Sequence, residues 1–197
     1  MKNYFFIAIA LVAFSFSSHA QDIRLGAKGG FNFANFRGDD ADDAEVRTSF
    51  FVGGLAEFKF SEKFAFQPEI LYSSQGAEGD FGGEDNIKAK LGYINFPLMG
   101  KYFVTDAFSV EVGPQVGVLV SKEWEANGDD SSLSVDPDDF YKDIDFGLNF
   151  GVGYEFSNGI FLTGRYNLGL SNVVDDGDDF DFEQKNGVWQ VGAGFFF

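Results

Sequence analysis

The chain contains no cysteine and a single histidine, His19. Without cysteine, neither a disulfide nor a lipid-modified cysteine anchor can form. His19 lies in a segment that we expect to be removed on export, so the mature protein would also lack imidazole. General-base catalysis near neutral pH and activated nucleophiles depend heavily on these two side chains. We therefore expect a protein that is not an enzyme and carries no cofactor, although a Ser–Lys dyad is still open.

Long apolar runs are also missing. Residues 5–16 are apolar but too few to span a bilayer, and they lie between Lys2 and the small-residue site Ser18-His19-Ala20. This pattern is typical of a secretory signal peptide. We expect residues 1–20 to be cleaved after Ala20, leaving 21–197 as one domain. An N-terminal anchor helix is the alternative, but no stop-transfer pattern follows. No later stretch reaches about 18 continuous apolar residues, so the sequence predicts no transmembrane helix.

Basic residues are few. The chain has 14 Lys and Arg against 31 Asp and Glu, for a net charge of −17, or −18 without Lys2. Because nucleic-acid binding needs a basic face, this balance argues against nucleic acid as a partner.

Phenylalanine and glycine, by contrast, are abundant, at 27 and 25 residues. Residues 143–156 have the sequence DIDFGLNFGVGYEF, in which every second residue is large and apolar while the others are small or polar. Side chains of a β-strand alternate between its two faces, so this segment predicts a strand with one apolar wall. In a membrane barrel, the apolar side chains of a strand face lipid and the small side chains face the narrow lumen, as this pattern predicts.

The same pattern recurs in eight segments. They are residues 23–35, 50–60, 64–75, 91–103, 108–121, 143–156, 160–171 and 187–197. Three connections are tight (61–63, 104–107 and 157–159), and four are long (36–48, 76–90, 122–142 and 172–186). The long ones carry 22 of the 31 acidic residues and only 7 bases, and all four would lie at one end.

This alternation of short and long connections is the layout of an outer-membrane barrel. We therefore expect an all-β, eight-stranded antiparallel transmembrane β-barrel with short periplasmic turns and long acidic extracellular loops. Aromatic residues near the tight turns would form a periplasmic interface ring: Phe58, Phe60, Phe64, Phe66, Tyr102, Phe108, Tyr154 and Phe156. A soluble sandwich and a secreted lipocalin-like binder, each with the apolar face inward, are the alternatives.

Two further features concern how the barrel closes. An open sheet edge in lipid would leave backbone groups unsatisfied, so residues 187–197 should pair with 23–35. Phe197, the last residue, resembles the C-terminal assembly signal of bacterial barrels, which implies recognition by the barrel-assembly machinery. Pro68, Pro97 and Pro114 fall within predicted strands, where each removes a hydrogen-bond donor, so we expect bulges or local widening near them.

Residues 93–103, YINFPLMGKYF, resemble the signature strand of the PorT-like family of small outer-membrane β-barrels. Residues 110–117 and 165–170 are similar to later strands of that family. Asn95 stands where the family usually has glutamate, and Gly100 where it has an aliphatic residue. The resemblance implies an OmpA- or OmpX-like barrel in the outer membrane of a Gram-negative bacterium. Most members have no assigned activity, and the name-giving member is linked to protein secretion.

The predicted inward faces carry as many basic as acidic residues. They are Arg24, Lys28, Lys59, Lys101 and Arg165, against Glu57, Glu69, Glu111, Asp145 and Glu155. Buried charges must be paired, and an eight-stranded lumen is only wide enough for its own side chains. We expect a plug of ion pairs. The alternative is a proton- or ion-conducting path.

The densest acidic run is a weak candidate for a Ca²⁺ loop. Its carboxylates belong to Asp175, Asp176, Asp178, Asp179, Asp181 and Glu183. Hard cations prefer several oxygen ligands, but the spacing does not match an EF-hand, and a solvated anionic loop is the simpler interpretation. The sequence thus favours a structural or surface-interaction barrel in contact with outer-membrane lipid, with divalent cations or an extracellular partner at the loops. A narrow pore or a transport- or secretion-associated barrel is the alternative.

Overall fold

The computed structural model describes residues 22–37, 44–80, 86–126, 142–172 and 185–197, and the regular structure among them is all β-strand. The strands are β1 Asp22–Arg37, β2 Ala44–Glu45, β3 Arg47–Lys59, β4 Phe64–Asp80, β5 Asn86–Phe103, β6 Phe108–Ala126, β7 Ile144–Glu155, β8 Ile160–Gly169 and β9 Lys185–Phe196. Within these ranges, no helix has the length and apolar character needed to cross a membrane.

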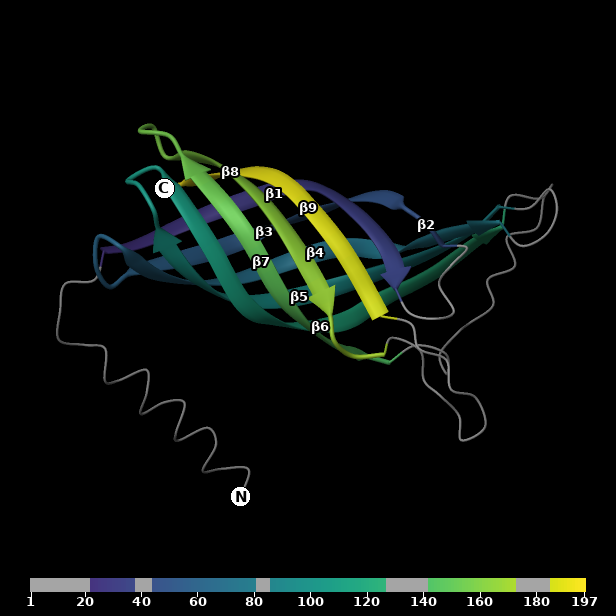
Figure 1. Cartoon of the computed structure of the whole chain (residues 1–197). Helices are drawn as coiled ribbons and strands as arrows, with labels where there is room; N and C mark the ends of the chain where they lie inside the picture. Colours follow the sequence, from purple (N-terminus) through teal and green to yellow (C-terminus); the bar gives the residue numbers. More distant parts are fainter. Residues whose placement is uncertain (1–21, 38–43, 81–85, 127–141, 173–184) are drawn as a thin grey trace, which may run out of the picture.

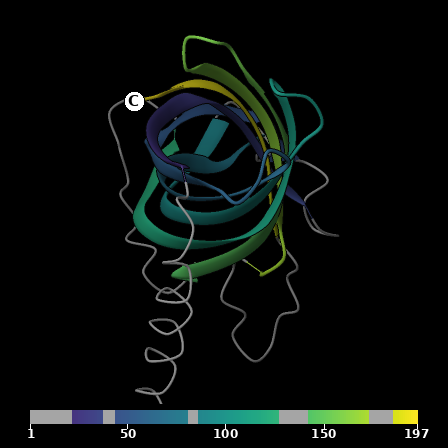
Figure 2. The same cartoon turned by 90° about the vertical axis from the view of Figure 1, so that its left-hand side faces the viewer.

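The eight long strands form a closed antiparallel barrel. Each pairs with its neighbours in the order β4-β3-β1-β9-β8-β7-β6-β5, and pairing of β4 with β5 completes the ring. Figure 2 looks along the barrel and shows this ring of strands around the interior. The predicted closure is confirmed, since β1 and β9 pair antiparallel from Gly26 with Phe196 to Arg37 with Lys185.

Three tight turns join strands at one barrel end, on the left of Figure 1, which we call the turn end. The backbone amides of Phe60, Val104 and Phe156 donate to the carbonyls of Phe64, Phe108 and Ile160 at 3.0, 2.9 and 2.8 Å. A side-chain oxygen in each turn also accepts from a nearby backbone amide; the three residues are Ser61, Thr105 and Asn158. The predicted turns are therefore confirmed, and each is fixed by its own polar residue.

At the opposite barrel end, which we call the loop end, the predicted strand boundaries were wrong. β4 and β6 continue to Asp80 and Ala126, and β5 begins at Asn86, so most of the predicted loop 76–90 is strand. In the predicted loop 36–48, the short β2 pairs with β4 and Arg47 already belongs to β3. Cross-strand backbone hydrogen bonds need no apolar side chains, so pairing continues beyond the alternating pattern on which the prediction rested.

The three prolines interrupt pairing without shifting it. Pairing of β3 with β4 stops at Leu55 with Glu69 and resumes in the same register at Phe58 with Phe66, beside Pro68. Similar gaps adjoin Pro97 on the β4 side and Pro114 on the β5 side. The register shift of the β5–β6 pair lies instead between Gly92 and Tyr93. The gaps in pairing agree with the predicted local widening near the prolines, whereas a bulge, the other predicted form, does not occur at these three residues.

Side chains alternate between the outer wall and the interior as predicted. On β7, Phe146, Phe150 and Tyr154 are exposed on the outer wall while Asp145 and Asn149 are buried. The interior is not uniformly small and polar, however. Several large apolar residues also point inward, namely Phe51, Leu55, Phe103, Phe161 and Phe196. Leu55, Phe161 and Phe196 form an apolar cluster that fills part of the lumen near the turn end.

Candidate functional site: the charged interior of the barrel

Eight of the ten predicted interior charges form one continuous series of ion pairs, which we call the charge chain. In order of contact, its members are Glu155, Arg24, Glu57, Lys101, Glu111, Arg165, Glu69 and Lys28. Acids and bases alternate along it, and its members come from every long strand except β9. Because each residue lies on the inward face of its strand, closing the barrel brings them together.

The part of the chain farthest from solvent centres on Glu69. Arg165 donates two hydrogen bonds to its carboxylate, from Nη1 to Oε2 at 2.9 Å and from Nη2 to Oε1 at 2.8 Å. Lys28 Nζ lies 2.7 Å from the same Oε2. Arg165 also reaches Glu111 Oε2 at 3.2 Å. Paired, charge-assisted hydrogen bonds of this kind are the strongest ordinary polar contacts in proteins.

The remaining part leads towards the turn end. Lys101 Nζ lies 2.9 Å from Glu57 Oε2 and 3.6 Å from Glu111 Oε1. Arg24 donates to Glu57 Oε1 at 2.6 Å and to Glu155 Oε2 at 2.7 Å. The side chains of Arg24 and Glu155 keep 24% and 20% of their surface exposed, so the chain begins at solvent and ends fully buried.

Gln67 closes a ring within the charge chain. Its Nε2 donates to Glu69 Oε1 at 2.7 Å, and its Oε1 accepts from Lys101 Nζ at 3.0 Å. The sequence predicts that Gln67 points inward, two residues before Glu69, but gives no sign that it bridges opposite charges. Its amide provides one donor and one acceptor, so it links the base and the acid without adding charge.

Aromatic rings pack against the cationic members. The guanidinium of Arg24 lies 4.0 Å from the centre of the Phe196 ring, and Lys101 Nζ lies 5.4 Å from that of Phe103. Such contacts attract a cation to the ring face while excluding water. The inward phenylalanines thus seal the spaces between the ion pairs.

The structure leaves two of the predicted charges out of the charge chain. Lys59 Nζ lies 4.8 Å from the centre of the Phe103 ring and has no ion pair with the described residues. Asp145 accepts hydrogen bonds from Ser171 Oγ at 2.6 Å and from Asn186 Nδ2 at 3.0 Å, again without an ion pair among the described residues. Lys59 lies near the turn end and Asp145 near the loop end, so they cannot pair with each other.

Neutral amides occupy the lumen on the loop side of the charge chain. Asn32 Nδ2 donates to Ser73 Oγ at 2.9 Å, and its Oδ1 accepts from Gln190 Nε2 at 2.9 Å. On the other side of the lumen, Asn167 donates to Asn149 and Asn149 donates to Gln115, at 3.1 and 3.2 Å. The interior therefore consists of a charged section followed by an amide section.

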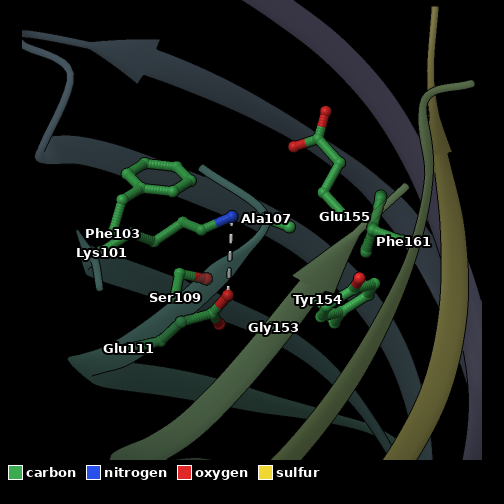
Figure 3. Close-up of a pocket in the computed structure, with 9 residues that line it drawn as sticks. All are labelled: Lys101, Phe103, Ala107, Ser109, Glu111, Gly153, Tyr154, Glu155 and Phe161. Carbon is green, nitrogen blue, oxygen red and sulfur yellow. Dashed lines mark ion pairs between the residues drawn. The ribbon is translucent and has the colours of Figure 1, made fainter. Parts of the chain in front are cut away.

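A gap beside the charge chain is small. Figure 3 shows it between Lys101, Glu111 and Glu155, with the ring of Phe103 beside Lys101. The cavity measures about 10 Å³, which is about the space that one water molecule needs. The charged section of the lumen therefore holds a buried network of salt bridges, with a narrow gap beside it.

The predicted location of Arg47 was wrong, and the candidate Ca²⁺ loop lies outside the described residues. Arg47, which the sequence assigned to a loop, is buried in β3 and donates to the carbonyl of Gln75 at 2.5 Å. Asp175, Asp176, Asp178, Asp179, Asp181 and Glu183 all lie outside the described residues. The same is true of the expected signal peptide, residues 1–20.

A closed eight-stranded antiparallel barrel with an apolar outer wall and a charged interior defines the class of small outer-membrane barrels. Residues 17–175 match the family described as "Outer membrane protein beta-barrel domain", and the chain belongs to this family. No curated protein matches the chain in sequence.

The fold is similar to that of one solved structure with a TM-score above 0.5, and two further structures are reported beside it. Neisserial surface protein A (NspA) superposes with a TM-score of 0.56 at 12% identity, covering 88% of this chain and 97% of that one. Ail, the attachment invasion locus protein of Yersinia pestis, gives a TM-score of 0.46 at 13% identity over 88% and 98%. OprG from Pseudomonas aeruginosa gives 0.45 at 14% identity over 90% and 97%. At these identities the likeness to NspA supports the fold alone.

Proposed function

We propose that this protein is a non-enzymatic outer-membrane barrel whose interior is a closed plug and whose acidic loops act at the cell surface. On this view, the barrel is a rigid support in the outer membrane of a Gram-negative bacterium. The barrel-assembly machinery recognises β9 together with Phe197, which follows it, and inserts the barrel. The acidic loops then contact divalent cations or an extracellular partner.

The charge chain is the observation that carries this proposal. Four acids and four bases are all paired, so the series has no net charge and no member free to attract a permeating ion. Breaking a buried pair leaves an uncompensated charge in a poorly solvated place. Opening a path through this section would therefore cost several kcal/mol for each pair broken.

Planar-bilayer recordings of the purified, refolded protein test the plug. We expect no steady conductance from the unmodified barrel. A variant with Lys28, Glu69 and Arg165 all changed to alanine vacates the centre of the charge chain, and we expect it to conduct, which shows that the assay detects an open lumen. Large, steady conductance of the unmodified protein would contradict the proposal.

A narrow pore is the second candidate, and one observation favours it. The charge chain starts at the partly exposed Arg24 and Glu155 and continues without a break to Lys28, as a path for protons or ions would. The resemblance of residues 93–103 to the PorT-like family points in turn to a transport- or secretion-associated role. The same recordings distinguish the pore from the plug.

A further inference from the structure

Asp145 is a buried carboxylate without a cationic partner among the described residues. Only 5% of its surface is exposed, and its hydrogen-bond donors, Ser171 and Asn186, are neutral. Residues 127–141 and 173–184, which precede β7 and β9, contain no Lys or Arg. These adjoining segments therefore cannot supply the missing positive charge.

The other described cations of the lumen do not pair with Asp145. The eight members of the charge chain sum to zero, and Lys59 lies near the opposite end of the barrel. The buried Arg47 lies on β3, four strands away from β7 around the ring, and donates to the carbonyl of Gln75. A buried carboxylate with neutral surroundings is costly unless a cation or a proton neutralises it. A single positive charge is what the site lacks.

The amide of Asn95 faces the same place. Gly117 pairs with both Asn95 and Asp145 across the neighbouring strands. A Cβ on Gly117 would lie 2.7 Å from Asn95 Oδ1 and 3.6 Å from Asp145 Cβ, so the oxygen points into the space beside Asp145. Asn95 is only 1% exposed, and neither of its amide atoms has a hydrogen-bond partner.

A second amide oxygen without a hydrogen-bond partner belongs to Asn167 of β8, which pairs with Asn149, two inward positions from Asp145 on β7. Asn167 is 2% exposed, and its Oδ1 has no hydrogen bond. A Cβ on Gly147 would lie 2.7 Å from Asn167 Nδ2 and 3.2 Å from Asn167 Oδ1, so this amide occupies the space beside Gly147. Gly117, which pairs with Asp145, and Gly147, the next inward residue of β7, thus leave room for the amides of Asn95 and Asn167.

We propose that Asp145, Asn95 and Asn167 bind one monovalent cation of the Na⁺ type, which enters from the loop end. The ligands are all oxygens, as a hard cation requires, and one carboxylate balances one positive charge. Ca²⁺ instead prefers six to eight oxygens, commonly including several carboxylates. The sequence predicts 22 acidic residues in the connections at the loop end, and a cluster of this sign raises the local concentration of cations.

Urea unfolding of the refolded protein in detergent tests the site. We expect the urea midpoint of unfolding to be higher in NaCl than in N-methylglucamine chloride at equal ionic strength. It should also rise to a plateau as the Na⁺ concentration increases, because a ligand stabilises the state that binds it. Asp145→Asn should abolish this response. Asp143→Asn is the matched control. It removes the same charge only two residues away in the sequence, but from a side chain that is 81% exposed. This variant should keep the Na⁺ response.

Equal midpoints of the unmodified protein in the two salts would overturn the proposal, as would a Na⁺ response retained by Asp145→Asn. If Asp145→Asn does not fold, anomalous diffraction from crystals of the unmodified protein grown with Tl⁺ gives an independent answer. We expect a peak in contact with Asp145 and Asn95. Peaks confined to other places, or none, would exclude the site.

Discussion

Arg165 on β8 holds Glu69 on β4 through two hydrogen bonds of 2.8 and 2.9 Å, although the residues are 96 positions apart in the sequence. Around the ring of long strands, β4 and β8 are four steps apart in either direction. The pair therefore connects opposite walls of the barrel. Among the ion pairs of the charge chain, this one most directly connects the two halves of the barrel.

Arg165→Ala should lower the free energy of unfolding in detergent by about 3–5 kcal/mol, because Glu69 and Glu111 would each lose a partner while still buried. Urea titration followed by tryptophan fluorescence measures the loss. A double-mutant cycle with Glu69→Ala should give a coupling energy well above zero, since the two residues share one set of hydrogen bonds.

Lys63→Ala is the control for this prediction. Lys63 is an exposed residue of the first tight turn, so its loss should change stability by less than about 0.5 kcal/mol. Arg47 is unsuitable as an exposed control because it is buried and hydrogen-bonded. Equal losses for Arg165→Ala and Lys63→Ala would contradict a packed, paired interior.

Adding a methyl group should affect stability differently at two adjacent glycines of β3. A Cβ on Gly53 would lie 2.0 Å from the carbonyl oxygen of Ile70, whereas one on Gly54 meets nothing nearer than 3.8 Å. Gly53→Ala forces the β3 and β4 backbones apart and should cost about 1–3 kcal/mol. Gly54→Ala should be neutral or slightly stabilising. Comparing unfolding midpoints of the two variants tests the register, and similar losses in both would argue against it.

Deletion of residues 195–197 should prevent assembly. Phe196 stacks on Phe161 with ring centres 4.8 Å apart, and the amide of Phe197 donates to the carbonyl of Leu25 at 2.8 Å across the closing seam. Without these contacts the seam between β1 and β9 loses its turn end, and open edges are not tolerated in lipid. Membrane fractionation and heat-dependent gel mobility report the result. Normal insertion with unchanged mobility would count against this role of the last strand.

The acidic segment 175–183 should bind Ca²⁺ weakly, in the range of roughly 10⁻⁴–10⁻³ M that is typical of extracellular modules. Changing Asp178, Asp179 and Asp181 to asparagine should weaken this binding. Calorimetry with Mg²⁺ as the control distinguishes ligation from screening, because screening by either ion would be the same. Heats that are identical for the two ions would leave only an anionic surface.

The sequence by itself determined which way each strand faces. A period of two residues is a property of the extended backbone, so Glu57, Glu69, Glu111 and Arg165 could be assigned to the interior before any partner was known. The three tight turns and the closure of the last strand on the first followed in the same way. The strand ends at the loop end could not be predicted in this way, because backbone pairing continues where the apolar alternation has ceased.

Tertiary structure alone decided which charges meet. Arg165 pairs with Glu69 and Glu111 rather than with Glu155, which is only ten residues away in the sequence. The register of eight strands, summed around a closed ring, sets which inward positions share a level of the lumen. The same geometry leaves Lys59 against Phe103 and Asp145 among amides, so the equal count of five acids and five bases did not become five pairs. Composition gives the number of charges, but their partners depend on long-range register, which no local pattern contains.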